Sequence, residues 1–337
     1  MKKLFLLIFF ISIQLIAANK YFYFESEAFS NIKRIIHNDK YFYVLNNSER
    51  IIFTKTSDTD GHIIKKIVSN GQGPFELVYP VDMDIKNNKI FIINQFGEYF
   101  IYDLDIDKLS VKKKINYNIK YGNVYKVSFL DTNHLIISFF NFFSGNLNIK
   151  NGKICHWIIY NLQDKSITPI WIPINYIPEL KLMFKLNTQI FFNYGILNGN
   201  EIILTFMGSD HIVIYNLKNQ NVDLTLKINH DGYFEPHEVN HKIYGKGAKI
   251  PSTFIDKGMP FNNALYFLSG GKDPIRPQLI IIYSNFNYLK KNINVVKEFS
   301  GYLSLNSSIF GGYLYYWENW NLMPRPSFGF GKMKLDF

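Results

Sequence analysis

Residues 69–103 read SNGQGPFELVYPVDMDIKNNKIFIINQFGEYFIYD. A turn rich in Gly and Pro opens this stretch, and three short apolar runs follow, separated by Asn and Gly. Short apolar runs bounded by Asn, Asp and Gly are typical of β-strands, because these turn residues accept the backbone angles of a tight connection. The stretch therefore predicts a turn followed by antiparallel strands.

The same order recurs along the chain. A turn followed by an apolar strand occurs six times, at HNDKYFYVLNN (37–47), KNNKIFIINQF (86–96), DTNHLIISFFN (131–141), NGNEIILTFMG (198–208), FNNALYFLSGG (261–271) and FGGYLYYWEN (310–319). A second strand follows each copy, at RIIFTKTS (50–57), YFIYDLD (99–105), HWIIYNLQ (156–163), HIVIYNLK (211–218), QLIIIYSN (278–285) and FGFGKMKLDF (328–337). With one strand before each pair and a looser one after most pairs, the repeat has four strands in about 53 residues, which is the signature of a β-propeller blade.

The repeats predict an all-β fold, a six-bladed β-propeller of four-stranded antiparallel blades. A single blade cannot bury both of its faces, so neighbouring blades must stack. The last repeat ends at Phe337 with only three strands, whereas the N-terminal run YFYFE (21–25) has no blade of its own. We expect this N-terminal strand to become the missing outer strand and to close the ring.

The first 18 residues have the layout of a secretory signal peptide. Lys2 and Lys3 precede an apolar run, residues 4–16, and Ala17 and Ala18 offer a cleavage site. This run is shorter than the roughly 20 residues that span a bilayer as a helix. We expect residues 1–18 to be a cleaved signal peptide and residues 19–337 to form a single propeller domain, which would be monomeric, periplasmic or extracellular, and not an integral membrane protein.

Charge and cysteine content narrow the classes of partner. The formal net charge is +10, but the lysines are scattered and only four arginines occur, so we expect no nucleic-acid partner. The single cysteine, Cys155, lies in the strand-like run KICHWIIY and predicts a buried, inert thiol.

The turn in residues 69–103 combines glycine, proline and glutamate, at Gly71, Gly73, Pro74, Glu76 and Pro80. It resembles the bacterial six-bladed propellers of the NHL and TolB-like type, whose blades often begin with a Gly-x-Gly-Pro-Gly-Glu-Phe turn followed by Pro. Phe75 stands where Gly is usual in them, and Leu77 where Phe is usual. The resemblance implies fold and secretion, and no activity. We expect the turn to be structural, because a phosphate-binding loop needs a helix behind it.

Binding sites of propellers usually gather on the face that carries the loops between blades and the loops between second and third strands. Two arginines there are each followed by Pro, in DPIRP and MPRP, and suit a carboxylate or phosphate group. Trp317 and Trp320 are either a sugar-stacking platform or packing between blades. The candidate ligand-binding residues are Arg276, Arg325, Trp317, Trp320, Lys272 and Asp273.

A second candidate site lies in residues 230–241, which are rich in His and acidic residues. The run HEVNH (237–241) fits the zinc-protease pattern, but Pro236 and Gly245 leave no room for the helix that this chemistry requires. A divalent metal held by His237, His241, Glu238 and Glu235 remains open, and so does a solvated polar loop.

No Ser-His-Asp arrangement, nucleophile elbow or paired-carboxylate spacing stands out, and apart from that metal no cofactor is predicted. The sequence favours a binding or scaffold protein for a peptide, glycan or protein partner. The alternative is a metal-assisted hydrolase or lactonase-like enzyme at the channel mouth.

Overall fold

The computed structural model describes residues 22–23, 32–38, 41–118, 121–141, 149–178, 190–206, 211–227, 259–261, 264–266, 279–281, 297–299, 308–310, 313–320 and 327–334. The chain divides into two compact units, one made of residues 1–70 and 306–337 and the other of residues 71–305. None of the described residues belongs to a helix with the length and hydropathy that crossing a bilayer requires.

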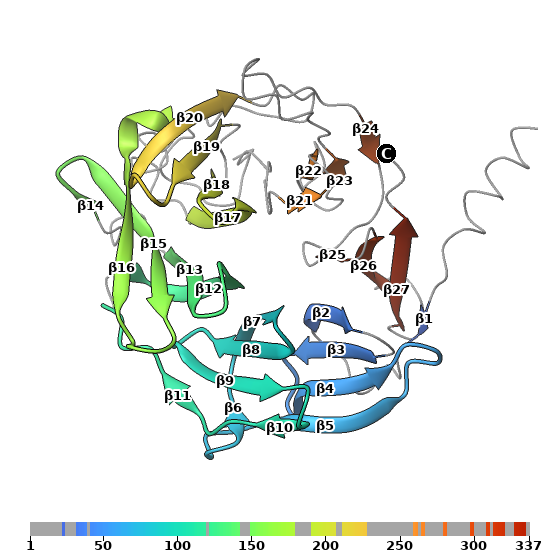
Figure 1. Ribbon diagram of the computed structural model, residues 1–337. Coiled ribbons are helices and arrows are strands. Elements are labelled where there is room, and N and C mark those ends of the chain that lie inside the picture. The colour runs from blue at the N-terminus through green and yellow to red at the C-terminus, as the bar shows by residue number, and fades with distance from the viewer. Residues whose placement is uncertain are drawn as a thin grey trace, which may run out of the picture. The chain divides into compact units, whose positions relative to one another are not determined.

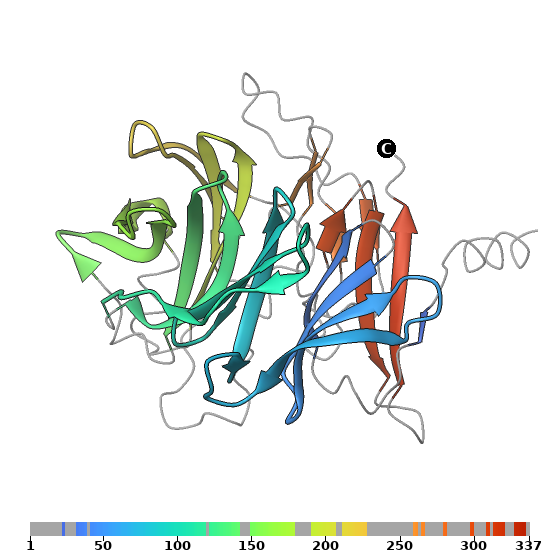
Figure 2. The same ribbon diagram turned by 60° about the horizontal axis from the view of Figure 1, so that its bottom comes forward.

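The first unit contains two antiparallel sheets (Figures 1 and 2). One is a meander of β2 (Ile32–Asn38), β3 (Tyr41–Asn46), β4 (Ile51–Ser57) and β5 (Ile63–Asn70). The other has the order β1-β27-β26-β25, from β1 (Phe22–Tyr23), β25 (Ser308–Phe310), β26 (Tyr313–Trp320) and β27 (Ser327–Lys334). Phe22 lies opposite Phe330 and Tyr23 opposite Gly329, so a strand from the N-terminus forms the edge of the C-terminal sheet.

The second unit begins with β6 (Glu76–Leu77) and continues with three larger repeats (Figure 1). The first of these repeats contains β7 (Pro80–Lys86), β8 (Lys89–Asn94), β9 (Glu98–Asp103), β10 (Lys108–Leu109) and β11 (Lys113–Lys114). The next contains β12 (Asn123–Phe129), β13 (His134–Asn141), β14 (Ile149–Lys150), β15 (Lys153–Asn161), β16 (Ile167–Pro173) and the 3-10 helix η3 (Ile174–Tyr176). The third contains β17 (Ile190–Asn198), β18 (Glu201–Phe206), β19 (His211–Asn216) and β20 (Asn221–Lys227). Two short hairpins follow, β21 (Met259–Phe261) with β22 (Ala264–Tyr266), and β23 (Leu279–Ile281) with β24 (Lys297–Phe299).

The strands predicted in the two recurrent units are present. The apolar strand that follows each turn corresponds to β3, β8, β13, β18, β22 and β26. The second recurrent strand corresponds to β4, β9, β15, β19, β23 and β27. The two strands pair antiparallel in β3–β4, β8–β9, β13–β15, β18–β19 and β26–β27. The described residues of β22 and β23 lie instead in separate two-stranded sheets.

The connection after the third strand has the same construction in four repeats. In each case the side chain of the last residue of the strand accepts a hydrogen bond from the backbone N–H two residues later, which is the geometry of an Asx or Ser turn. These bonds are Thr59 N–H to Ser57 Oγ at 3.2 Å, Asp105 N–H to Asp103 Oδ1 at 3.1 Å, Gln163 N–H to Asn161 Oδ1 at 2.8 Å, and Lys218 N–H to Asn216 Oδ1 at 3.0 Å. The pattern Tyr-Asp/Asn-Leu in three of these turns thus marks one repeated element.

The apolar core of the second unit lies between successive sheets. One cluster joins β8, β9, β12, β13 and β15 and includes Phe91, Tyr99 and Phe139. A second joins strands from β13 to β19 and includes Trp157 and Tyr194. Because each cluster takes side chains from two repeats, the repeats bury their apolar faces against each other, as stacked blades do.

A charged residue, half-buried in one case and buried in two, follows a β-bulge in the first strand of three repeats. The register shifts just before Arg34 on β2, Asp82 on β7 and Lys126 on β12. Bulges re-aim side chains. The Val127 N–H donates to the Asp82 carboxylate at 3.0 Å, and the Lys126 ammonium donates to the Tyr194 carbonyl oxygen. In the second unit, therefore, these side chains bond the inner strand of one repeat to the backbone of the next.

Candidate binding face

Most of the residues predicted to form a site lie outside the described residues. This holds for Arg276, Arg325, Lys272, Asp273, His237, His241, Glu238 and Glu235. Trp317 and Trp320 lie within β26, where their backbones are opposite Phe330 and Ser327. The two tryptophans are therefore part of a regular strand rather than of the loop that follows it.

In the repeat that contains β7 to β11, the described residues include the end of the sheet at which these loops were expected. Pro80 at the start of β7 lies opposite Asn94 at the end of β8, and Lys114 on β11 lies opposite Glu98 at the start of β9. The turn 94–98 and the segments before β7 and after β11 consequently meet at one end of this sheet. We call residues 71–79, 94–98, 115–118 and 121–122 the loop face.

The segment before β7 is folded around its own glutamate. The Gly73 N–H donates to the Glu76 carboxylate at 2.8 Å, and a Cβ atom at Gly71 would lie only 2.1 Å from the same carboxylate. Gly71 also has a φ of 155°, which residues with a side chain rarely adopt, so glycine is favoured at this position. Leu77, which stands in place of the usual Phe, is fully buried. In this segment the carboxylate that the Gly73 N–H binds belongs to the segment itself.

Lys112 fastens this segment to the outer edge of the sheet. Its backbone N–H donates to the Pro74 carbonyl oxygen at 3.2 Å, and its ammonium donates to the carbonyl oxygens of Gln72 at 3.0 Å and Glu76 at 3.2 Å. Three bonds from one residue hold the loop in place.

The turn 94–98 is organised by buried Asn94. Its Oδ1 accepts from the Phe96 N–H at 3.0 Å and from the Glu98 N–H at 2.8 Å, and its Nδ2 donates to the Glu98 carboxylate at 2.8 Å. Gly97 has a φ of 80°, and a Cβ atom there would lie 2.6 Å from Cε1 of Tyr117. Since the Gly97 N–H also donates to the Asn94 carbonyl oxygen at 3.1 Å, the backbone donors of residues 96, 97 and 98 all bond to Asn94, and these bonds fix the turn.

Two of the exposed aromatic side chains of the loop face contact each other. Tyr79 is 56% exposed and Phe96 is 42% exposed, and their rings meet edge to face with centroids 6.0 Å apart. Tyr79 has a φ of 50°, in the left-handed region that non-glycine residues rarely adopt. The Gln95 N–H donates to the Tyr79 carbonyl oxygen at 3.1 Å, so the two aromatic residues are held side by side through the backbone.

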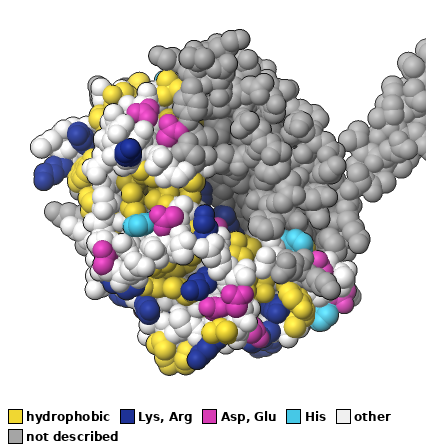
Figure 3. Space-filling view, viewed as in Figure 1, with side chains coloured by type: hydrophobic (Ala, Val, Ile, Leu, Met, Phe, Trp, Pro, Cys, Tyr) yellow, Lys and Arg dark blue, Asp and Glu magenta, His cyan; other side chains and the backbone are white. Residues whose placement is uncertain are grey.

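Sequence reasoning did not single out this pair, because aromatic residues in a propeller were expected to pack between blades. The available signal was their position, since Tyr79 directly precedes the first strand and Phe96 sits in an Asn-Gln-Phe-Gly turn. The described surface in Figure 3 shows hydrophobic side chains interspersed with lysine and arginine.

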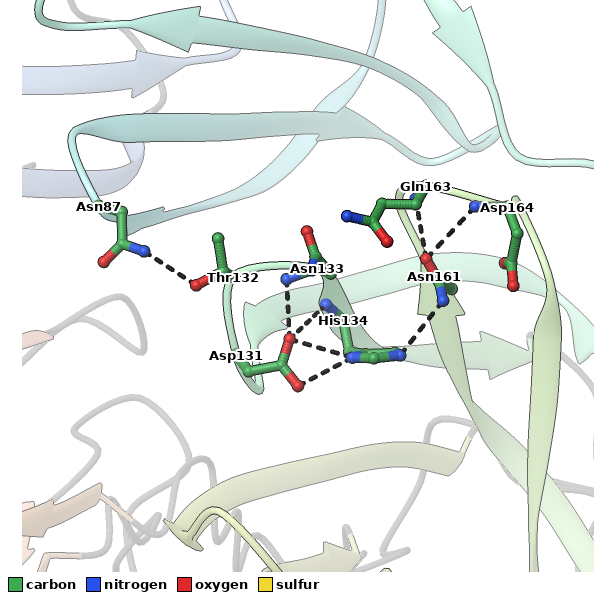
Figure 4. Close-up of polar contacts among 8 residues, drawn as sticks. All are labelled: Asn87, Asp131, Thr132, Asn133, His134, Asn161, Gln163 and Asp164. Atoms are coloured by element: carbon green, nitrogen blue, oxygen red, sulfur yellow. Dashed lines mark hydrogen bonds and ion pairs between the residues drawn. The ribbon is translucent and has the colours of Figure 1, made fainter.

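A polar cluster at the opposite end of the repeats has a structural explanation (Figure 4). Asp131 accepts from the Asn133 N–H at 2.7 Å and the His134 N–H at 2.9 Å, and it lies 2.8 Å from His134 Nδ1. Asn87 Nδ2 donates to Thr132 Oγ1 at 2.9 Å and so links two repeats. No group of three or more His, Cys, Asp or Glu suited to a metal ion occurs within the described ranges. These residues organise turns.

No protein-family model matches the chain, and no curated protein matches its sequence. Solved structures do match it. A member of the DUF4221 family from Bacteroides vulgatus is 12% identical with a TM-score of 0.60, covering 94% of this chain and 97% of that one. The WD40 repeats of RRP9 are 11% identical with a TM-score of 0.54, covering 94% and 97%. A protein of Bacteroides fragilis named as exported is 9% identical with a TM-score of 0.54, covering 94% and 96%.

At these identities the likeness concerns the fold alone. WD40 repeats build β-propellers, sheets of four strands arranged around an axis. The described sheets of this chain are antiparallel, and their apolar residues are buried between repeats. The chain is therefore an all-β protein with a β-propeller fold.

Proposed function

We propose that this propeller is a binding or scaffold protein that recognises a peptide, glycan or protein partner through the loop face. The exposed Tyr79–Phe96 pair carries the proposal. Exposed aromatic side chains are costly to leave in water, and they supply much of the energy of protein interfaces. Here the backbone beneath them is already fixed by hydrogen bonds, so little further conformational entropy is lost when a partner binds.

The test is capture of partners by the tagged mature protein. We expect Tyr79→Ala combined with Phe96→Ala to reduce recovery of the captured partner at least tenfold, because truncating a central aromatic residue typically costs about 2 kcal/mol or more. Ile106→Ala is the matched control, since Ile106 is 67% exposed in the turn after β9, at the other end of the same repeat. Equal capture by both variants would remove the loop face from the binding site.

We propose that the arginine-containing loops belong to the same face. In an antiparallel meander, the connection between second and third strands emerges at the same end as the connection to the next blade. Arg276 and Arg325 each fall in such a connection, and Lys272 and Asp273 precede Arg276. An anionic group shared by the two arginines would lose about 1.5–3 kcal/mol of binding when either is changed to Ala.

We also propose that the ring has six blades of the NHL or TolB-like type and is closed by the N-terminal strand. The pairing of β1 with β27 supports closure, and the recurrence of the two-strand unit supports the count. Residues 1–18 are the proposed export signal, and residues 19–337 the single mature domain. Mass spectrometry of the secreted protein should find Asn19 as the first residue.

Elemental analysis of the purified mature protein separates binding from the enzymatic alternative. A stoichiometric divalent metal that is lost on changing His237 and His241 to Ala would support metal-assisted hydrolysis. A metal-free protein that captures a partner would support the binding function.

A further inference from the structure

The chemistry of the loop face narrows the class of partner, and the inference rests on the proposed binding function. Its apolar part extends beyond the Tyr79–Phe96 pair. Phe75 in the loop face is also exposed, and so is Val111 beside it, between β10 and β11; the two residues flank the hydrogen bond between Pro74 and Lys112. Apolar side chains are therefore exposed on both sides of the hydrogen bond that joins Lys112 to Pro74.

The acidic and basic side chains beside these apolar contacts differ in their exposure to solvent. Glu76 and Glu98 are half-buried, and their carboxylates accept hydrogen bonds from Gly73 N–H and Asn94 Nδ2, so both turn inward. On β11, which leads into the loop face, Lys113 and Lys114 are exposed. Among the described residues of the loop face and β11, the exposed ionic groups are therefore ammonium groups.

We propose that the loop face takes an acidic peptide segment that places an aromatic or proline side chain against Tyr79 and Phe96 and its carboxylates near Lys113 and Lys114. Apolar contact supplies the anchor, and opposite charge supplies selectivity and faster association. A neutral glycan would use the aromatic pair but gain nothing from the lysines.

The experiment is selection of a random 12-residue peptide library on the immobilised mature protein. We expect the enriched peptides to combine an aromatic or proline residue with a net negative charge. Replacing the acidic residues of an enriched peptide by Asn and Gln should weaken its binding about tenfold, since two exposed ion pairs together contribute about 1.4 kcal/mol. Rising salt should remove the same difference.

Matched variants separate the two parts of the inference. Lys113→Glu with Lys114→Glu should abolish the preference for acidic peptides, whereas Lys89→Glu, at the exposed start of β8 and the other end of the repeat, should keep it. Tyr79→Ala with Phe96→Ala should weaken acidic and neutral peptides alike. Peptides enriched without a charge bias, but sensitive to the aromatic variant, would overturn the acidic partner and leave the loop face as the site. No enriched peptide at all would overturn the peptide class, and binding that is insensitive to the aromatic variant would overturn the proposed function as well.

Discussion

Cys155 and His156 are adjacent on β15, and both are fully buried. Burial raises the pKa of the Cys155 thiol to about 12, so the buried thiol expected from the sequence is confirmed and carries its proton at neutral pH. Burial also lowers the pKa of His156 to about 3, although its Nδ1 lies 3.2 Å from the Tyr121 carbonyl oxygen. The desolvation of a charged imidazole outweighs that one hydrogen bond.

His156 therefore makes stability depend on pH. In the folded protein the imidazole stays neutral down to about pH 3, whereas in the unfolded chain it takes up a proton near pH 6.5. Between these values the unfolded chain binds more protons, so the free energy of unfolding should fall as the pH is lowered, by at most about 1.4 kcal/mol per pH unit. Urea unfolding of wild type and His156→Gln from pH 4 to 8 should show a shallower slope in the variant. Parallel slopes would mean that His156 titrates normally.

Two glycines with a positive φ distinguish the cost of backbone strain from the cost of steric crowding by an added Cβ atom. Gly97 has a φ of 80° and Gly152 a φ of 70°, but an added Cβ at Gly152 meets nothing within 4 Å. Gly152→Ala should cost only the backbone term, about 1–2 kcal/mol. Gly97→Ala should cost about 1–3 kcal/mol more, because Tyr117 is held by the Gln95 carbonyl oxygen and packs on Phe139. Thermal unfolding of the two variants measures the difference, and equal losses would show that Tyr117 moves freely.

At the scale of elements, the inner strands of successive repeats are joined by side chains instead of a continuous ladder. Asp82 and Asp84 on β7 accept from the N–H groups of Val127 and Phe129 on β12, at 3.0 and 2.7 Å. Elsewhere the backbone does join two repeats, since Phe140 on β13 lies opposite Phe191 on β17. Side-chain hydrogen bonds thus join β7 to β12, whereas backbone pairing joins β13 to β17.

Removing one of these carboxylates should loosen that boundary. Asp82→Ala leaves the fully buried Val127 N–H without its acceptor, which should lower the free energy of unfolding by about 1–3 kcal/mol. Asp105→Ala is the control, because Asp105 accepts its hydrogen bond in an exposed turn, and such changes usually stay within about 0.5 kcal/mol. Similar denaturant midpoints for the two variants would contradict a stabilising role for the Asp82 carboxylate.

At the scale of the whole molecule, the N-terminal strand lies along β27 in the C-terminal sheet. Without it, β27 becomes an edge strand with backbone groups open to other chains. Deleting residues 19–26 should therefore lower the melting temperature and promote aggregation, relative to a protein that begins at residue 19. An unchanged melting temperature and solubility would show that this strand does not close the fold.

The sequence by itself determined where the strands lie and how the turns are built. Turn chemistry is local: the side chain of Asp103, Asn161 or Asn216 bonds a backbone group two residues away, so its meaning can be read without knowing the fold. The repeat of such units predicts a propeller, because each unit must bury a face against its neighbour. The burial of Cys155 followed from its place in an apolar run.

Only the tertiary structure decided which charged residues are buried and which aromatic residues are exposed. Asp82 and Lys126 look like ordinary surface residues in the sequence, but a register shift and a neighbouring repeat supply their partners. Tyr79 and Phe96 look like core residues, yet the end of the sheet leaves them in solvent. The partners of Asp82 and Lys126 lie 45 and 68 residues away in the chain, and a local pattern contains no information about which strand will be the neighbour.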